Sequence, residues 1–125
     1  MNARQLVSFT TLSACVLWLV TVAAATRAAG FQEGQVREFT VRGDHYAFSP
    51  ASLTVNKGDV VKVTFTAADI PHSFTIDGYR ISKRAGAGES VTFQFRADQT
   101  GSYPIYCNLS ADPKCKDMKG SLTVR

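Results

Sequence analysis

Histidine and cysteine are scarce in this chain, which has two histidines and three cysteines among its 125 residues. A trinuclear copper cluster alone needs more imidazole ligands than the whole chain holds, so the multicopper oxidases are excluded. Any metal chemistry is therefore confined to one small site.

Long charged runs are also lacking, and 14 Lys+Arg stand against 10 Asp+Glu. With 45% hydrophobic residues, this composition fits one small globular domain rather than two domains or a long disordered tail. The sequence has no Ser-His-Asp pattern in a motif context, no HExxH and no paired carboxylates in a recognisable frame, so we do not expect an enzyme. It also lacks the interleaved basic and aromatic residues of RNA-binding proteins, so we expect no nucleic-acid partner.

The first 25 residues have the pattern of an export signal. Their one charge, Arg4, precedes an apolar run from Leu6 to Ala25 that ends in small residues, as in segments that are removed on export. We expect residues 1–25 to be a signal peptide and residues 26–35 to be a flexible lead-in. The mature domain, of about 100 residues, would then reside in the periplasm or outside the cell.

Two other interpretations of this segment stay open. The apolar run is about 20 residues long, which is enough to span a bilayer if the segment is retained as an anchor. Membrane attachment is expected only in that case. The stretch from Leu12 to Cys15 matches a lipoprotein box, although the residues after Cys15 remain apolar where a mature lipoprotein turns polar.

From residue 36 onward, hydrophobic residues recur with period two over short segments. Val61, Val63 and Phe65 alternate with polar residues, which is typical of a strand with one face in a core. Turn signals rich in Gly, Pro, Asn and Asp separate such segments. The candidate strands are Val36–Arg42, Ser52–Val55, 61–66, His72–Ile76, 91–96 and Gly120–Arg125. We expect an all-β fold, a Greek-key β-sandwich of about seven strands over residues 36–125.

Four soft donor side chains stand near the ends of these segments. His72 begins one strand, Cys107 ends another, and Cys115 and Met118 lie in the loop before the last strand. One end of a sandwich would bring all four together. An imidazole, two thiols and a thioether suit copper and are poorly suited to magnesium or calcium.

The two cysteines of the mature chain also have a simpler interpretation. Cys107 and Cys115 enclose seven residues, and a disulfide closing this loop would stabilise the fold by about 2.6 kcal/mol through chain entropy. An exported protein permits either a disulfide or a metal site. Taken alone, His72 would be interpreted as a structural histidine, and Met118 would be interpreted as a residue that packs in the hydrophobic core. Only their combination with the cysteines indicates a site.

An ordered series of motifs covers nearly all of the mature chain. The motifs are Phe48-x-Pro50, Leu53-x-Val55, Gly58-Asp59, His72-Ser73-Phe74, Gly101-x-Tyr103, Tyr106-Cys107 and Met118-x-Gly120-x-Leu122-x-Val124. This series resembles the cupredoxins. The resemblance implies a cupredoxin-like β-sandwich with a copper site at one end, normally used for one-electron transfer. It also implies that His72 is the upstream histidine ligand, Cys107 the thiolate and Met118 the axial thioether.

The chain departs from the family pattern at the second histidine, because no histidine follows Cys107. Its loop spacing is similar to that of the binuclear copper domain of cytochrome oxidase subunit II and nitrous oxide reductase, C-x3-C-x3-H-x2-M. At those positions this chain has Cys107, Ala111, Cys115 and Met118. Alanine in place of the second cysteine argues against a binuclear centre with two bridging thiolates.

These observations lead to two hypotheses of different classes. The leading one is an exported copper-binding protein that holds one copper ion per chain through His72, Cys107, Cys115 and Met118 and serves in electron transfer or copper handling. If it delivers copper, the excess of sulfur donors favours the cuprous ion. The alternative is a metal-free structural or interaction module of the same fold with a Cys107–Cys115 disulfide.

Basic residues gather in two places, Arg80-x-x-Lys83-Arg84 and Lys114-x-Lys116-x-x-Lys119, and the second lies beside the proposed ligands. They form either a solvated surface or an electrostatic surface that steers an acidic redox partner protein. We expect the protein to be a monomer.

Overall fold

The computed structural model describes residues 34–125. The expected signal peptide at 1–25, and all but the last two residues of the expected lead-in at 26–35, lie outside the described residues. Within the described part, no helix is long and apolar enough to cross a membrane.

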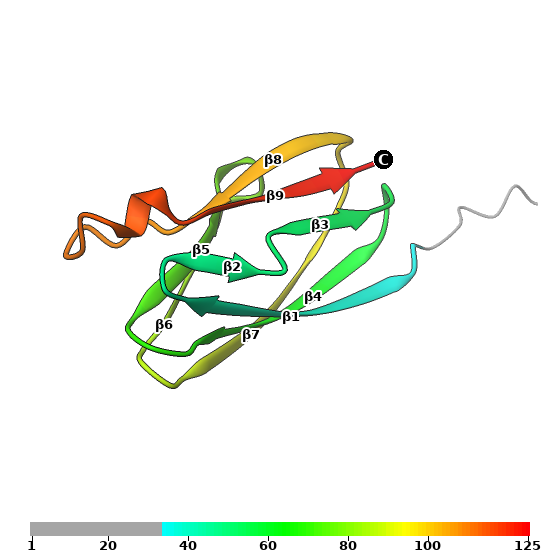
Figure 1. Ribbon diagram of the computed structural model, residues 1–125. Coiled ribbons are helices and arrows are strands. Elements are labelled where there is room, and N and C mark those ends of the chain that lie inside the picture. Colours follow the sequence, from blue (N-terminus) through cyan, green and yellow to red (C-terminus); the bar gives the residue numbers. More distant parts are fainter. Residues whose placement is uncertain (1–33) are drawn as a thin grey trace, which may run out of the picture. The chain divides into compact units, whose positions relative to one another are not determined.

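The described chain is an all-β sandwich of two sheets, as the period-two pattern predicted (Figure 1). Its strands are β1 (Val36–Asp44), β2 (Ala47–Ser49), β3 (Ser52–Val55), β4 (Val60–Ala67), β5 (His72–Ile76), β6 (Ile81–Ala85), β7 (Ser90–Arg96), β8 (Gly101–Tyr106) and β9 (Lys119–Val124). Two short 3-10 turns, η1 (Asp77–Tyr79) and η2 (Cys115–Asp117), precede β6 and β9.

One sheet has four strands in the order β2-β1-β4-β7, and the other has five in the order β3-β9-β8-β5-β6. The pairs β1 with β4 and β3 with β9 are parallel, and the remaining pairs are antiparallel. Each parallel pair therefore joins two strands that do not follow each other in the chain. The strands between them must cross to the other sheet or to another position.

The described residues form nine strands where about seven were expected, because the pattern did not reveal β2 and β6. Strand β2 has only three residues, too few to show a period. Strand β6 buries Ile81 and Ala85 at its ends and exposes Ser82, Lys83 and Arg84 between them. As an edge strand, it carries the charges that protect an open edge from further pairing.

The core lies between the sheets and follows the alternation seen in the sequence. Val61, Val63 and Phe65 of β4 are completely buried. Strand β5 differs, since all five of its residues are buried. Its outward-facing Ser73 is covered by Asn108, whose side-chain oxygen accepts a hydrogen bond from the Ser73 hydroxyl at 2.7 Å. The loop that follows β8 therefore folds over β5, and this overlap creates the enclosed end of the sandwich where the site lies.

Candidate metal centre

Strand pairing brings the four predicted ligands to one end of the five-stranded sheet. His72 begins β5, Cys107 follows β8, and Cys115 and Met118 immediately precede β9. Since β8 runs antiparallel to both β5 and β9, the end of β8 meets the starts of the other two strands. All four side chains are at most 1% exposed. The expected convergence of these residues is therefore found.

Backbone hydrogen bonds connect these four positions. The Ser73 N–H donates to the Cys107 sulfur at 3.3 Å, and the Leu109 N–H donates to the Cys115 sulfur at 3.2 Å. The Cys107 N–H donates to the Met118 carbonyl, also at 3.3 Å. Each sulfur thus has a fixed N–H donor, which is a favourable environment for negative charge on sulfur.

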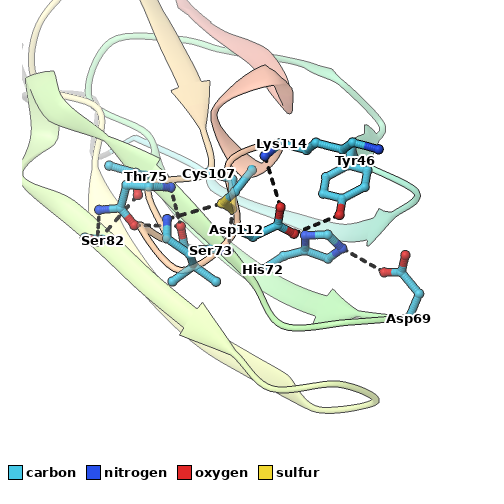
Figure 2. Close-up of a disulfide and its surroundings, with 12 residues drawn as sticks. Tyr46, Asp69, His72, Ser73, Thr75, Ser82, Cys107, Asp112 and Lys114 are labelled. Carbon is cyan, nitrogen blue, oxygen red and sulfur yellow. Dashed lines mark hydrogen bonds and ion pairs between the residues drawn. A yellow bond between two sulfur atoms is a disulfide. The ribbon is translucent and has the colours of Figure 1, made fainter.

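The two cysteines form a disulfide, with their Cα atoms 5.1 Å apart (Figure 2). This is the pairing that the sequence left open as an alternative to metal binding. While the sulfurs are bonded to each other, neither is a thiolate ligand. A ligand set of one histidine, two cysteines and one methionine therefore requires prior reduction of this bond.

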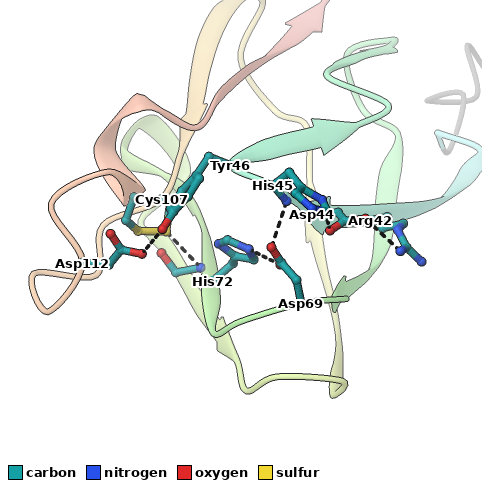
Figure 3. Close-up of polar contacts among 10 residues, drawn as sticks. Arg42, Asp44, His45, Tyr46, Asp69, His72, Cys107 and Asp112 are labelled. Atoms are coloured by element: carbon teal, nitrogen blue, oxygen red, sulfur yellow. Dashed lines mark hydrogen bonds and ion pairs between the residues drawn. A yellow bond between two sulfur atoms is a disulfide. The ribbon is translucent and has the colours of Figure 1, made fainter.

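The two ring nitrogens of His72 have different surroundings. Its Nε2 lies 2.7 Å from Oδ1 of Asp69, whereas its Nδ1 is buried without a hydrogen-bond partner among the described residues. In Figures 2 and 3 the ring directs Nε2 to Asp69 and turns its other nitrogen to the side where Cys107 and Asp112 lie. A buried polar atom without a partner is uncommon, and an imidazole combined with sulfur donors at one end of a sheet suits copper.

Asp69 was not singled out in the sequence, although it stands three residues before His72. Its Oδ2 accepts a hydrogen bond from the His45 N–H at 3.0 Å. Partial burial raises the pKa of Asp69, but hydrogen bonds from the His45 and Ile70 N–H groups and from His72 outweigh this effect. The pKa of this carboxyl is therefore held well below its ordinary value, and Asp69 is a carboxylate at neutral pH.

Tyr46 connects the hairpin of β1 and β2 to the loop between the two cysteines. Its hydroxyl donates to Oδ2 of Asp112 at 2.8 Å, and its ring meets the His72 ring edge-on with centroids 5.9 Å apart. The hydrogen bond to Asp112 raises the pKa of Tyr46, with burial adding to the effect. Tyr46 thus covers His72 and holds the loop that carries Asp112.

The turn that presents Tyr46 has an unusual sequence. His45 and Tyr46 have φ values of 49° and 59°, and they connect the paired residues Asp44 and Ala47. A two-residue hairpin turn of type I′ requires positive φ at both positions and normally uses Asn-Gly or Asp-Gly. Because this turn lacks those residues, sequence patterns did not indicate it.

Met118 is accommodated by a glycine on the opposite sheet. A Cβ atom at Gly43 would lie 2.9 Å from Cε of Met118 and 3.0 Å from the Phe65 ring. Glycine at this position of β1 therefore leaves room for the thioether of Met118 at the enclosed end of the core.

A second group of donor atoms lies on the exposed side of Asp69. Oxygen and nitrogen atoms of Asp44, His45 and Asp69 lie within 4.8 Å of one another. Arg42 already contacts Asp44 at 2.9 Å, and Asp69 is occupied by His72 and the His45 N–H. We therefore assign no ligand to this group.

One residue of each predicted basic cluster, Arg84 and Lys116, lines a pocket at the loop that follows Cys107, whereas Arg80 lies at the other end of the β5–β6 pair. Arg84 lines a pocket of about 270 Å³ together with Leu109 and Asp112. Lys116 lines another, of about 360 Å³, to which Cys107 contributes. Within the described residues, none of the six basic residues of these clusters forms an ion pair. Arg84 and Lys116 therefore place positive charge beside this loop, and the ammonium of Lys114 lies 5.9 Å from the centre of the Tyr46 ring.

Comparison with known proteins bears on both the fold and the site. The model of a family described as Cupredoxin-like domain matches residues 12–124. Among curated proteins, cytochrome c oxidase subunit 2 of Thermus thermophilus is 25% identical over 80 residues, which cover 64% of this chain and 59% of that protein. The chain thus spans less than two thirds of this relative.

Solved structures of similar fold include two proteins whose descriptions mention copper. The metal binding domain of the Cu(I)-exporting P-type ATPase CopA of Streptococcus pneumoniae, determined with Cu(I), has a TM-score of 0.62 and 21% identity, covering 74% of this chain and 89% of that one. Auracyanin A, a "blue" copper protein of Chloroflexus aurantiacus, has a TM-score of 0.61 and 18% identity, covering 72% and 99%. At these identities the likeness concerns the fold.

Proposed function

This chain belongs to the cupredoxin-like domain family, and from that premise we propose that it is an exported protein that binds one copper ion through His72, Cys107, Cys115 and Met118. Its role is electron transfer or copper handling. The main observation in support of this proposal concerns His72. Its Nδ1 is buried and has no hydrogen-bond partner among the described residues, and it lies at the end of the sandwich where both cysteine sulfurs also lie.

The donor chemistry supports copper rather than a harder ion. One imidazole, two thiolates and a thioether form a soft set that suits copper. Copper, when bound there, would supply a one-electron redox couple. The chain's own contribution is to exclude water, since all four side chains are buried, and to direct the N–H groups of Ser73 and Leu109 at the sulfurs. Such N–H donors stabilise a thiolate and adjust the properties of a bound metal.

The disulfide makes reduction the first step of this function. A dithiol reductant transfers two electrons and two protons to the Cys107–Cys115 bond, giving two thiols, and is itself oxidised to a disulfide. The thiols then lose their protons to act as ligands. The oxidised protein is the metal-free module that the sequence analysis left as the alternative, and we propose that it is the resting form of the same copper protein.

We propose that the partner is an acidic protein and that the basic residues beside the loop after Cys107 guide it to the candidate centre. Arg84 and Lys116 flank the loop after Cys107, so an acidic surface docked there lies close to one of the proposed ligands. Attraction of this kind raises the rate of encounter more than the affinity, and salt weakens it.

Exchanging each histidine in turn tests the copper site. We expect His72→Gln to abolish stoichiometric copper binding by the reduced protein, because the buried imidazole is lost. The matched control is His45→Gln, which removes the chain's other histidine at a position where the side chain is 88% exposed and should leave binding unchanged. Copper is measured by elemental analysis of protein purified from the exported fraction. Equal copper content in the two variants would contradict the proposed site.

The same preparations distinguish the two proposed roles. Affinities for the cuprous and cupric ions are compared at fixed pH, because sulfur-rich sites favour the cuprous ion. A clear preference for the cupric ion would count against copper delivery and leave electron transfer as the role.

A further inference from the structure

Asp69 connects an exposed loop to the most buried histidine of the molecule. Its Oδ1 lies 2.7 Å from Nε2 of His72, a side chain that is fully buried. Its Oδ2 is held by the N–H of His45 in the turn between β1 and β2. Figure 3 shows the carboxylate between these two histidines. The turn between β1 and β2 therefore holds the Asp69 carboxylate in place. Its contact with His72 is fixed from both sides.

We propose that Asp69 is a positioning residue that keeps the ring proton of His72 on Nε2, so that Nδ1 presents its lone pair to a metal ion held with Cys107. This inference rests on the proposed function and adds to it the residue that prepares the histidine ligand.

The hydrogen-bonding capacities of the two groups support this assignment. A carboxylate only accepts hydrogen bonds, so the 2.7 Å contact requires Nε2 to donate. Neutral imidazole has one N–H, and the other nitrogen is then an acceptor. That nitrogen is Nδ1, which is buried without a partner among the described residues. The same arrangement, with a carboxylate behind a histidine ligand, orients the ring and increases its basicity in metal sites generally.

Among residues 34–125, no other group around His72 fixes this choice. The Tyr46 ring packs edge-on against His72, but the Tyr46 hydroxyl is engaged by Asp112. Without Asp69, the proton of His72 would distribute between the two nitrogens, and the fraction with a free Nδ1 would fall. Ring orientation and the basicity of Nδ1 would be lost as well, so we expect metal affinity to fall by about 10- to 100-fold, as for comparable partners of histidine ligands.

The first measurement needs no metal. Long-range ¹H–¹⁵N NMR of the His72 ring in the disulfide form reports which nitrogen carries the proton. We expect an unprotonated Nδ1 in the wild type and a mixture of tautomers in Asp69→Ala. Asp69→Asn, whose side-chain oxygen still accepts a hydrogen bond, should restore the wild-type tautomer. Asp44→Asn is the matched control, because Asp44 belongs to the same exposed group but does not bond His72.

The second measurement is the copper affinity of the same four proteins after reduction. Asp69→Ala should weaken binding by about 10- to 100-fold, and Asp44→Asn should match the wild type. A wild-type tautomer in Asp69→Ala, or an unchanged copper affinity in this variant, would overturn the positioning role. Failure of the reduced wild type to bind copper would overturn the proposed function instead, and the NMR result alone would then decide whether Asp69 positions His72.

Discussion

At the scale of single residues, Asp59 shows how one buried carboxylate organises a turn. It accepts hydrogen bonds from the backbone N–H groups of Gln35 at 3.0 Å and Asn56 at 2.9 Å, and it contacts Arg37 at 3.4 Å. The Asn56 hydrogen bond is the main cause that lowers the pKa of Asp59 below its ordinary value of 3.8, and burial opposes this effect. The Gln35 and Arg37 contacts lower the pKa further. Asp59 therefore joins the start of the described chain to the turn before β4.

The lowered pKa predicts how stability depends on pH. Because the folded state holds the pKa of Asp59 below 3.8, its contribution is complete above that pH and is lost as the pH falls below it. We expect Asp59→Asn to lower the free energy of unfolding at pH 7 and to lose less stability than the wild type between about pH 5 and pH 2. Urea unfolding across this range is the measurement. The exposed Asp98, changed to Asn, is the control, and parallel pH profiles for wild type and Asp59→Asn would contradict the prediction.

At the scale of elements, the alternation of β4 predicted both its strand and its buried face, because Val61, Val63 and Phe65 point into the core. The convergence of the site could also be predicted, since strand ends set it. The contacts of Asp69 and Tyr46 could not, because they depend on which turn passes over His72. No local pattern encodes that packing, and the His45-Tyr46 turn has no glycine or asparagine to reveal it.

Tyr46 links two elements, and this link predicts an effect on the disulfide. Its hydroxyl holds Asp112, which lies between the two cysteines in sequence. We expect Tyr46→Phe to cost only about 0.5–1.5 kcal/mol of stability but to increase the rate at which dithiothreitol reduces Cys107–Cys115, because the covering loop opens more often.

Timed trapping of free thiols measures that rate. Tyr103→Phe is the control, since the Tyr103 hydroxyl bonds the Gln99 carbonyl near the start of β8, whereas the disulfide lies beyond its end. If both variants were reduced as slowly as the wild type, Tyr46 would not restrain the loop.

At the scale of the whole molecule, the sandwich consists of two hydrogen-bonded sheets and one enclosed end at which a covalent bond, the disulfide, can form or break. The parallel pairs β1–β4 and β3–β9 each fix the strand register within one sheet. The enclosed end carries a disulfide, an unpartnered imidazole nitrogen and a thioether. We propose that this end exists in two exclusive states, a disulfide without metal and a dithiol with copper. Reduction would decide between them without changing the fold.

Copper stoichiometry before and after reduction distinguishes a protein with these two states from one without them. Protein from the exported fraction is divided into two halves. One half is left oxidised, and the other is reduced until two free thiols are counted. Both halves are then mixed with copper and desalted. We expect no bound copper in the oxidised half and one equivalent, with thiolate-to-copper absorption, in the reduced half. Equal copper in both halves, or none in the protein with two free thiols, would contradict this proposal.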